Sequence, residues 1–182
     1  MNGNYFAPQF EKFKTKQPYQ PGAKSIRYNR LAINPDNLGF RCAHCRAFVS
    51  TEPIISGVNN RNHCPYCLWS IHVDLLEVGD RLAACKENME PIGLTLKKTR
   101  KKYGEMDLGE LMIIHSCLDC GKISINRIAA DDDLENLNHL FTRTLAFEPA
   151  LKVKLENDGI LVLTAANKDV VRTRLFGIAE RN

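Results

Sequence analysis

The hydrophobic and polar positions divide this chain of 182 residues into three stretches. In residues 1–37, which are rich in Asn, Gln, Pro, Lys and Tyr, the apolar positions follow neither a period of 2 nor one of 3.6. A stretch of this kind does not bury a core, so we predict a flexible basic arm. Regular structure is expected to begin near residue 38, in a domain over 38–133 followed by an extension over 134–182.

The middle stretch predicts strands. "LWSIHVDLL" at 68–76 alternates, which is typical of a half-buried strand. Its apolar face is expected to hold Ile71, Val73 and Leu75, and its polar face Ser70, His72 and Asp74. "LMIIHS" at 111–116 and "KISINRIAA" at 122–130 predict two more strands, joined by a turn at 117–121.

The last stretch predicts a helix, a hairpin and a second helix. "DDDLENLNHLFTRTLA" begins with aspartates that can cap a helix, and one helical face carries Leu134, Leu137, Phe141 and Leu145. "LKVKLENDGILVLTA" alternates at Leu151, Val153 and Leu155, has a turn signal at Asn157-Asp158-Gly159 and continues as an apolar strand, so it predicts a β-hairpin. "NKDVVRTRLFGIAE" predicts a closing helix. Asn167 is expected to cap it, and its inward residues are Val171, Leu175 and Ile178.

The composition is that of a soluble globular protein, with 44% apolar and 25% charged residues. The apolar runs are far shorter than the roughly 20 residues of a membrane helix. The first residues do not have the basic and then apolar segments of a secretory signal. We therefore expect a cytoplasmic protein in a reducing compartment, with no membrane partner.

Seven cysteines, an odd number, argue against a disulfide framework. Six of them form C-x-x-C pairs, and two of these pairs have the spacing of a four-cysteine zinc ribbon. The ligands predicted for this first site are Cys42, Cys45, Cys64 and Cys67. Buried free cysteines, or iron in a rubredoxin-like site, are the alternatives. A thioredoxin-like redox site is not favoured, because the pairs lie among strands and turns rather than in a βαβ unit.

The third pair, Cys117 and Cys120, needs two more ligands, and Cys85 is the remaining thiol. A hairpin about Gly79 would place His72 almost opposite Cys85, so we favour His72 as the fourth ligand. His115, two residues before Cys117, is the alternative. Ligand pairs that interleave between the two sites, and an unmetallated third pair, also fit the count. The prediction is two zinc ions, neither of them catalytic.

Several motifs in register resemble the RNHCP domain family. They are "FRCAHCRAFV", "RNHCPYCLWSIHVD", "GDRLAAC", "MEPIGL", "IIHSCLDCG" and "INRIAADD". The resemblance covers residues 38 to about 135 and implies a small zinc-binding domain, without implying a particular activity. With the periodicity it predicts an α+β protein: a small β-rich zinc-ribbon-like domain with a C-terminal helix–hairpin–helix extension.

The triplet Arg61-Asn62-His63 precedes the second cysteine pair and has two interpretations. In the first it supports the metal loop, with Arg61 pairing with an acidic residue. The candidate partners are Asp74, Asp80 and Asp131 to Asp133. In the second interpretation the triplet contacts a phosphate or a base.

The positive charge is concentrated in two segments. The first 38 residues hold six Lys or Arg against two acids, so the other 144 residues balance at 19 against 19. "KKTRKK" at 97–102 carries five positive charges, and aromatic residues are interleaved in the arm. This pattern favours RNA or single strands over duplex DNA. The predicted contacts are Lys97, Lys98, Arg100, Lys101, Lys102, Lys12, Lys14, Arg27, Arg30 and Arg61.

The predicted function is therefore a structural-zinc protein that binds RNA, with a ribosomal particle as the candidate partner. A zinc-dependent protein-interaction module is the alternative. A metal-dependent enzyme is less favoured, because the chain has no nucleophile motif, phosphate loop or paired catalytic carboxylates. No catalytic residue is assigned, although His72, Asp74, Asp80 and His115 could supply a base and its orienting carboxylate.

Overall fold

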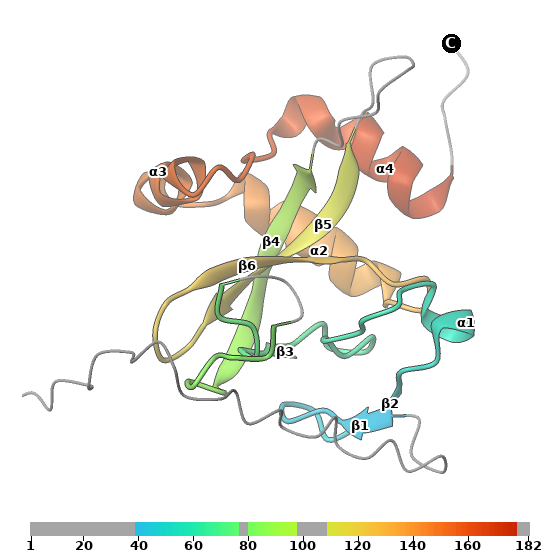
Figure 1. Ribbon diagram of the computed structural model, residues 1–182. Coiled ribbons are helices and arrows are strands. Elements are labelled where there is room, and N and C mark those ends of the chain that lie inside the picture. The colour runs from blue at the N-terminus through green and yellow to red at the C-terminus, as the bar shows by residue number, and fades with distance from the viewer. Residues whose placement is uncertain (1–38, 77–79, 98–108, 178–182) are drawn as a thin grey trace, which may run out of the picture. The chain divides into compact units, whose positions relative to one another are not determined.

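The computed structural model describes residues 39–76, 80–97 and 109–177 (Figure 1). The chain divides into two units, 1–33 and 34–182, and all described residues belong to the second. The predictions for the basic arm, for residues 98–102, for Gly79 and for Ile178 lie outside the described residues.

An antiparallel sheet of four strands, in the order β3-β4-β5-β6, organises the described residues. Its strands are β3 (Ser70–Ile71), β4 (Asn88–Lys97), β5 (Glu110–Cys117) and β6 (Ile123–Arg127). β5 and β6 confirm the two strands predicted around the turn at 117–121. β4 was not predicted, although Ile92, Leu94 and Leu96 alternate with Gly93 and Thr95. Its Pro91 and Gly93 are residue types that are uncommon inside a central strand.

The predicted strand at 68–76 is mostly wrong. Only Ser70 and Ile71 pair with β4, and the buried face is the polar one. Ser70 and His72 are buried, whereas Leu75 is 44% exposed. Ser70 donates a hydrogen bond to the Asn62 carbonyl at 2.5 Å, and His72 lies among cysteines. Polar interactions therefore decide which face is buried here.

A second, two-stranded sheet precedes the first. β1 (Gly39–Arg41) pairs antiparallel with β2 (Phe48–Ser50), and a single-turn helix, α1 (Pro53–Ser56), follows. Val49 is buried against a small cluster that consists largely of cysteines and includes Cys42 and Cys64. Thiols therefore make up much of the interior of this part.

Helix α2 (Leu134–Leu145) confirms the predicted helix and packs on β4. Of the predicted apolar face Leu137 and Phe141 are buried, whereas Leu134 and Leu145 are exposed. Asp133 caps it by accepting a hydrogen bond from the Asn136 N–H at 2.7 Å. The contact with the sheet is close at Gly93, where a Cβ atom would lie 2.5 Å from Phe147 and 2.6 Å from Thr144. A side chain at this position would force the helix away from the strand.

The predicted hairpin at 151–164 is wrong, because residues 149–157 form helix α3 (Pro149–Asn157). Leu151 and Leu155, four residues apart, face the core, whereas Val153 between them is 56% exposed. The Asn-Asp-Gly signal ends this helix, and Gly159 has a φ of 73°. The apolar period of 4 was read as a period of 2 because every second residue in the segment is apolar.

The closing helix is confirmed as α4 (Lys168–Phe176), which follows a 3-10 turn, η1 (Ala165–Asn167). Asn167 occupies the capping position, but its side chain accepts the Thr164 N–H at 2.9 Å instead of capping the helix. Val171 and Leu163 join Leu94 and Ile113 in one hydrophobic cluster, so the extension shares a core with the sheet. Among the residues that the structure describes, no helix has the length and apolar character to cross a membrane.

Candidate metal centres

All three C-x-x-C pairs fold into the same turn, which we call a knuckle. The N–H of the residue after the second cysteine donates to the carbonyl oxygen of the first, at 3.0, 2.8 and 3.1 Å in chain order. The N–H of the first cysteine donates to the carbonyl five residues later, at 2.9 Å in each knuckle. The residue after the second cysteine is left-handed in each, with φ of 66° at Arg46, 62° at Leu68 and 67° at Gly121. Gly121 adopts this conformation without strain, whereas Arg46 and Leu68 are residue types that rarely adopt it.

The first two knuckles face each other and bring together Cys42, Cys45, Cys64 and Cys67. The Sγ atoms of Cys42 and Cys67 lie 3.6 Å apart, as do those of Cys45 and Cys64. A zinc ion at about 2.3 Å from each ligand places tetrahedral sulfurs roughly 3.8 Å apart. These thiols therefore fit zinc, and this first metal group could hold one ion.

The second metal group consists of His72, Cys85, Cys117 and Cys120. The Sγ atoms of Cys85 and Cys117 lie 3.5 Å apart, and the Sγ of Cys120 lies 3.3 Å from Nδ1 of His72. A donor set of three thiols and one imidazole is a common structural zinc set. The ligand pairs are therefore grouped in chain order rather than interleaved, and this group could hold a second zinc ion.

His115, the alternative fourth ligand, lies outside this group. Its Nε2–H donates to the Leu68 carbonyl at 2.7 Å, and its Nδ1 accepts the side-chain amide of Asn126 at 3.0 Å. Complete burial lowers the pKa of His115 to about 3, so the ring stays neutral at physiological pH. Its hydrogen bonds connect the second knuckle to β6.

The thiols of the first metal group would release protons on binding zinc. Burial raises the pKa of Cys64 to about 11, and burial also raises the pKa of Cys67. The backbone N–H of Ala47 instead lowers the pKa of Cys45. Zinc binds the thiolate form, so the ion must displace protons from Cys64 and Cys67.

The Arg61 side chain is fully buried and joins the second knuckle to the segment before α2. Its guanidinium donates to both carboxylate oxygens of Asp131, at 2.8 and 2.5 Å, and to Asp132 at 3.2 Å. Burial opposes the ionisation of Asp131, but the hydrogen bonds and charge of Arg61 lower its pKa below the ordinary value. This geometry favours the structural interpretation of Arg61 over a phosphate contact.

The other two residues of the triplet make related contacts. The Nε2 atom of His63 lies 2.8 Å from Oδ2 of Asp132. The same carboxylate oxygen accepts a hydrogen bond from the Ala129 N–H at 2.7 Å. The side-chain amide of Asn62 donates at 3.2 Å to Asn126, the residue that contacts His115. The triplet therefore attaches the knuckle to the sheet and to the start of α2.

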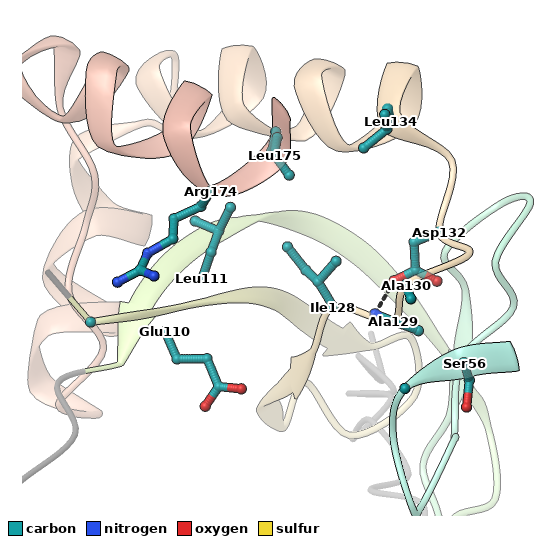
Figure 2. A pocket seen from close by; sticks show the side chains of 12 residues that line it. Ser56, Glu110, Leu111, Ile128, Ala129, Ala130, Asp132, Leu134, Arg174 and Leu175 are labelled. Carbon is teal, nitrogen blue, oxygen red and sulfur yellow. Dashed lines mark hydrogen bonds between the residues drawn. The ribbon is translucent and has the colours of Figure 1, made fainter. Parts of the chain in front are cut away.

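A pocket of about 570 Å³ lies next to this attachment, between the start of β5, the segment after β6, and helices α2 and α4. Figure 2 shows Glu110 and Arg174 at one end and Asp132 at the other. Its lining contains neither cysteine nor histidine, so it is separate from both metal groups. The Asp132 carboxylate already bonds Arg61, His63 and Ala129, so its oxygens are occupied.

Of the predicted RNA contacts, the structure describes Lys97 and Arg61. Lys97 is exposed at the end of β4, directly opposite Glu110 at the start of β5. The two strand ends that flank the basic run therefore lie at the same end of the sheet.

Comparison with known proteins gives one match. The RNHCP domain family matches residues 37–138, a range that includes both metal groups and the Arg61-Asn62-His63 triplet. No curated protein and no solved structure matches the chain.

Proposed function

The chain belongs to the RNHCP domain family, and from this premise we propose that it is a structural-zinc protein that binds RNA on a cytoplasmic ribosomal particle. Each metal group offers four protein ligands. A catalytic zinc site usually has three protein ligands and an open position. Four ligands per group support a role for zinc in holding the fold, with a zinc-ribbon-like arrangement in the first group.

The location of the positive charge carries the RNA part of the proposal. Lys97 is exposed where β4 ends, and it begins a run with five positive charges in six residues. The first 38 residues add a net charge of +4 by the count given above, while the rest of the chain is neutral. Outside these two segments the chain holds 14 Lys or Arg against 19 Asp or Glu, a net charge of −5, so the positive charge is confined to the two segments. Such a pattern suits phosphates.

The proposed contacts are the basic run and the arm. They are Lys97, Lys98, Arg100, Lys101 and Lys102, together with Lys12, Lys14, Arg27 and Arg30. Arg61 is not included, because its guanidinium is buried against Asp131 and Asp132.

The salt dependence of RNA affinity tests the proposal. Each phosphate contact adds roughly 0.7 to 0.9 to the slope of log K against log salt concentration. Replacing the five basic residues of 97–102 with Gln should flatten this slope by several units while zinc content stays the same. A control that replaces Lys86, Lys152 and Lys168 should change the slope much less per charge removed.

Competition separates RNA from an acidic protein partner, which would also be salt-sensitive. Unlabelled RNA should displace labelled RNA far better than an acidic polypeptide of matched charge. Equal displacement, or an unchanged slope in the five-residue variant, would contradict RNA binding.

The exposed face of α1 favours a second candidate, the protein-interaction module. Ile54 is 91% exposed and Ile55 is 48% exposed. Neighbouring exposed apolar side chains of this kind are typical of a surface that binds another protein. In this case Ile54→Ser should weaken binding of the partner, and neutralising the basic run should not.

A further inference from the structure

The β1–β2 hairpin has two chemically different faces. Phe40 and Val49, which are paired across the strands, pack against the cysteines of the first metal group. Arg41 and Phe48 form the next pair, so their side chains share the opposite face. Both residues of this outward pair are exposed, and Phe48 is 53% exposed.

The Phe48 ring packs against the backbone of Gly39 on this outward face. A Cβ atom added at Gly39 would lie 2.4 Å from the ring carbon Cζ of Phe48. The ring therefore occupies the space that the side chain of any residue other than glycine at position 39 would fill. Half of this large apolar side chain remains accessible to solvent although it is held in position.

A second flat surface lies at the tip of the first knuckle. The exposed His44 ring stacks on Trp69, with centroids 4.1 Å apart and planes 2° from parallel. His44 directly precedes Cys45, and Trp69 follows Cys67 by two positions. Ligation of both knuckles by one ion would therefore also fix this stack.

The charged side chains of the hairpin that carries Phe48 and His44 are both positive. The only charged side chains between residues 38 and 51 are Arg41 and Arg46, and both are exposed. Arg41 donates to the Arg46 carbonyl at 3.4 Å, which places the two arginines at the same end of the hairpin. Guanidinium groups next to exposed rings are the combination that binds single-stranded nucleic acid.

We propose that Arg41, His44, Arg46 and Phe48 form a surface, here called the stacking surface, that binds unpaired RNA bases. Bases stack on Phe48 and on the free face of His44, and the two arginines contact the adjoining phosphates. The inference rests on the proposed RNA function, and it specifies single-stranded segments, because a duplex hides the faces of its bases. The stacking surface is distinct from the basic run at 97–102.

The test compares two ligands of equal charge, an octauridine and an abasic ribose-phosphate oligomer of the same length. Base stacking should make the octauridine bind about tenfold more tightly. Trp69 is the only tryptophan in the chain, so its fluorescence reports binding next to His44. The octauridine should quench this fluorescence more strongly than the abasic oligomer.

Phe48→Ser should remove most of the preference for the octauridine and leave affinity for the abasic oligomer unchanged. The matched control is Phe176→Ser, because Phe176 is 45% exposed at the end of α4 and is not part of the stacking surface. Zinc content and melting temperature show whether each variant is folded. His44→Ala is a second variant, since it removes the other stacking ring and no proposed ligand.

The results separate this inference from the proposed function. Equal affinity of the wild-type protein for the two ligands, with a steep salt slope, would overturn the stacking surface and leave RNA binding intact. Unchanged preference in both Phe48→Ser and His44→Ala would do the same. Failure to bind either ligand, or equally effective competition by polyglutamate, would contradict both proposals.

Discussion

The two metal groups lie in different structural settings. Cys64 of the first group packs against a hairpin of two three-residue strands. Cys117 of the second group is the last residue of β5, an inner strand of the four-stranded sheet. The knuckles themselves have the same hydrogen bonds and the same left-handed residue. The apolar residues around them differ. The buried cluster at the first group contains two thiols and Val49, whereas the sheet next to the second group carries two larger clusters.

The difference indicates how much each group depends on its metal. A part of the chain with a small apolar core gains its folding free energy from the metal instead. We therefore expect the first group to require zinc for folding, and the second to keep most of its structure without zinc.

The largest effect is expected from Cys64→Ser, which removes a fully buried ligand of the first metal group. The loss of stability should be about 5 kcal/mol or more, because a structural zinc site in a peptide contributes roughly 10–16 kcal/mol. Elemental analysis should find one zinc ion instead of two, and hydrogen exchange should show that residues 39–69 have lost protection. Full protection of these residues in the variant would contradict the dependence on metal.

The next effect concerns the attachment between the first group and the rest of the protein. Arg61→Ala leaves Asp132 buried without its cation, and breaking a buried pair in this way costs about 3–5 kcal/mol. Chemical denaturation should show the loss, and RNA affinity per folded molecule should be unchanged. Arg143→Ala is the control, because Arg143 is half exposed in its pair with Glu90 and the expected cost is below about 1 kcal/mol. If Arg61→Ala kept its stability and lost RNA affinity, Arg61 would be a phosphate contact after all.

The smallest effect of the three is expected from Cys120→Ser, which removes an exposed ligand of the second metal group. The variant should lose one zinc ion and about 1–3 kcal/mol, the ordinary range for a single substitution. Hydrogen exchange at β4 and β5 should remain slow, since their packing on α2 does not involve this ligand. Unfolding of the whole sheet in the variant would show that both groups depend on metal equally.

The metal ligands could be predicted from the sequence because the C-x-x-C spacing fixes a local turn. Cys85 and His72 were added by counting ligands and by the expected proximity of His72 to Cys85, and the structure places both in the second group. Asp131 and Asp132 were among the candidate partners of Arg61, but the choice between five aspartates depended on tertiary contacts. The left-handed backbone at Arg46 and Leu68 could not be predicted from the sequence, since neither residue type favours this conformation.

The elements that were wrongly predicted share a physical cause. Alternation at Leu151, Val153 and Leu155 fits a strand and, through its first and last members, also a helix. The neighbouring β6 and Phe147 pack against Leu151 and Leu155, and the local pattern could not report this packing. In β4 the sheet is buried on both faces, and Gly93 and Pro91, which are uncommon inside a central strand, hid the alternation of Ile92, Leu94 and Leu96. Directly after β3, the burial of His72 followed from its place in the second metal group rather than from hydrophobicity.

The bond between Arg61 and Asp131 spans seventy residues of the chain. It begins in the motif Arg-Asn-His-Cys-Pro at 61–65, in which the three attachment residues directly precede Cys64, a candidate metal ligand. A knuckle pair exchanged by recombination from another protein would bring its own cysteines, but it would leave two aspartates without their arginine. Exchange of the metal loop is thus expected to keep the stability of the protein only when its docking aspartates are exchanged with it.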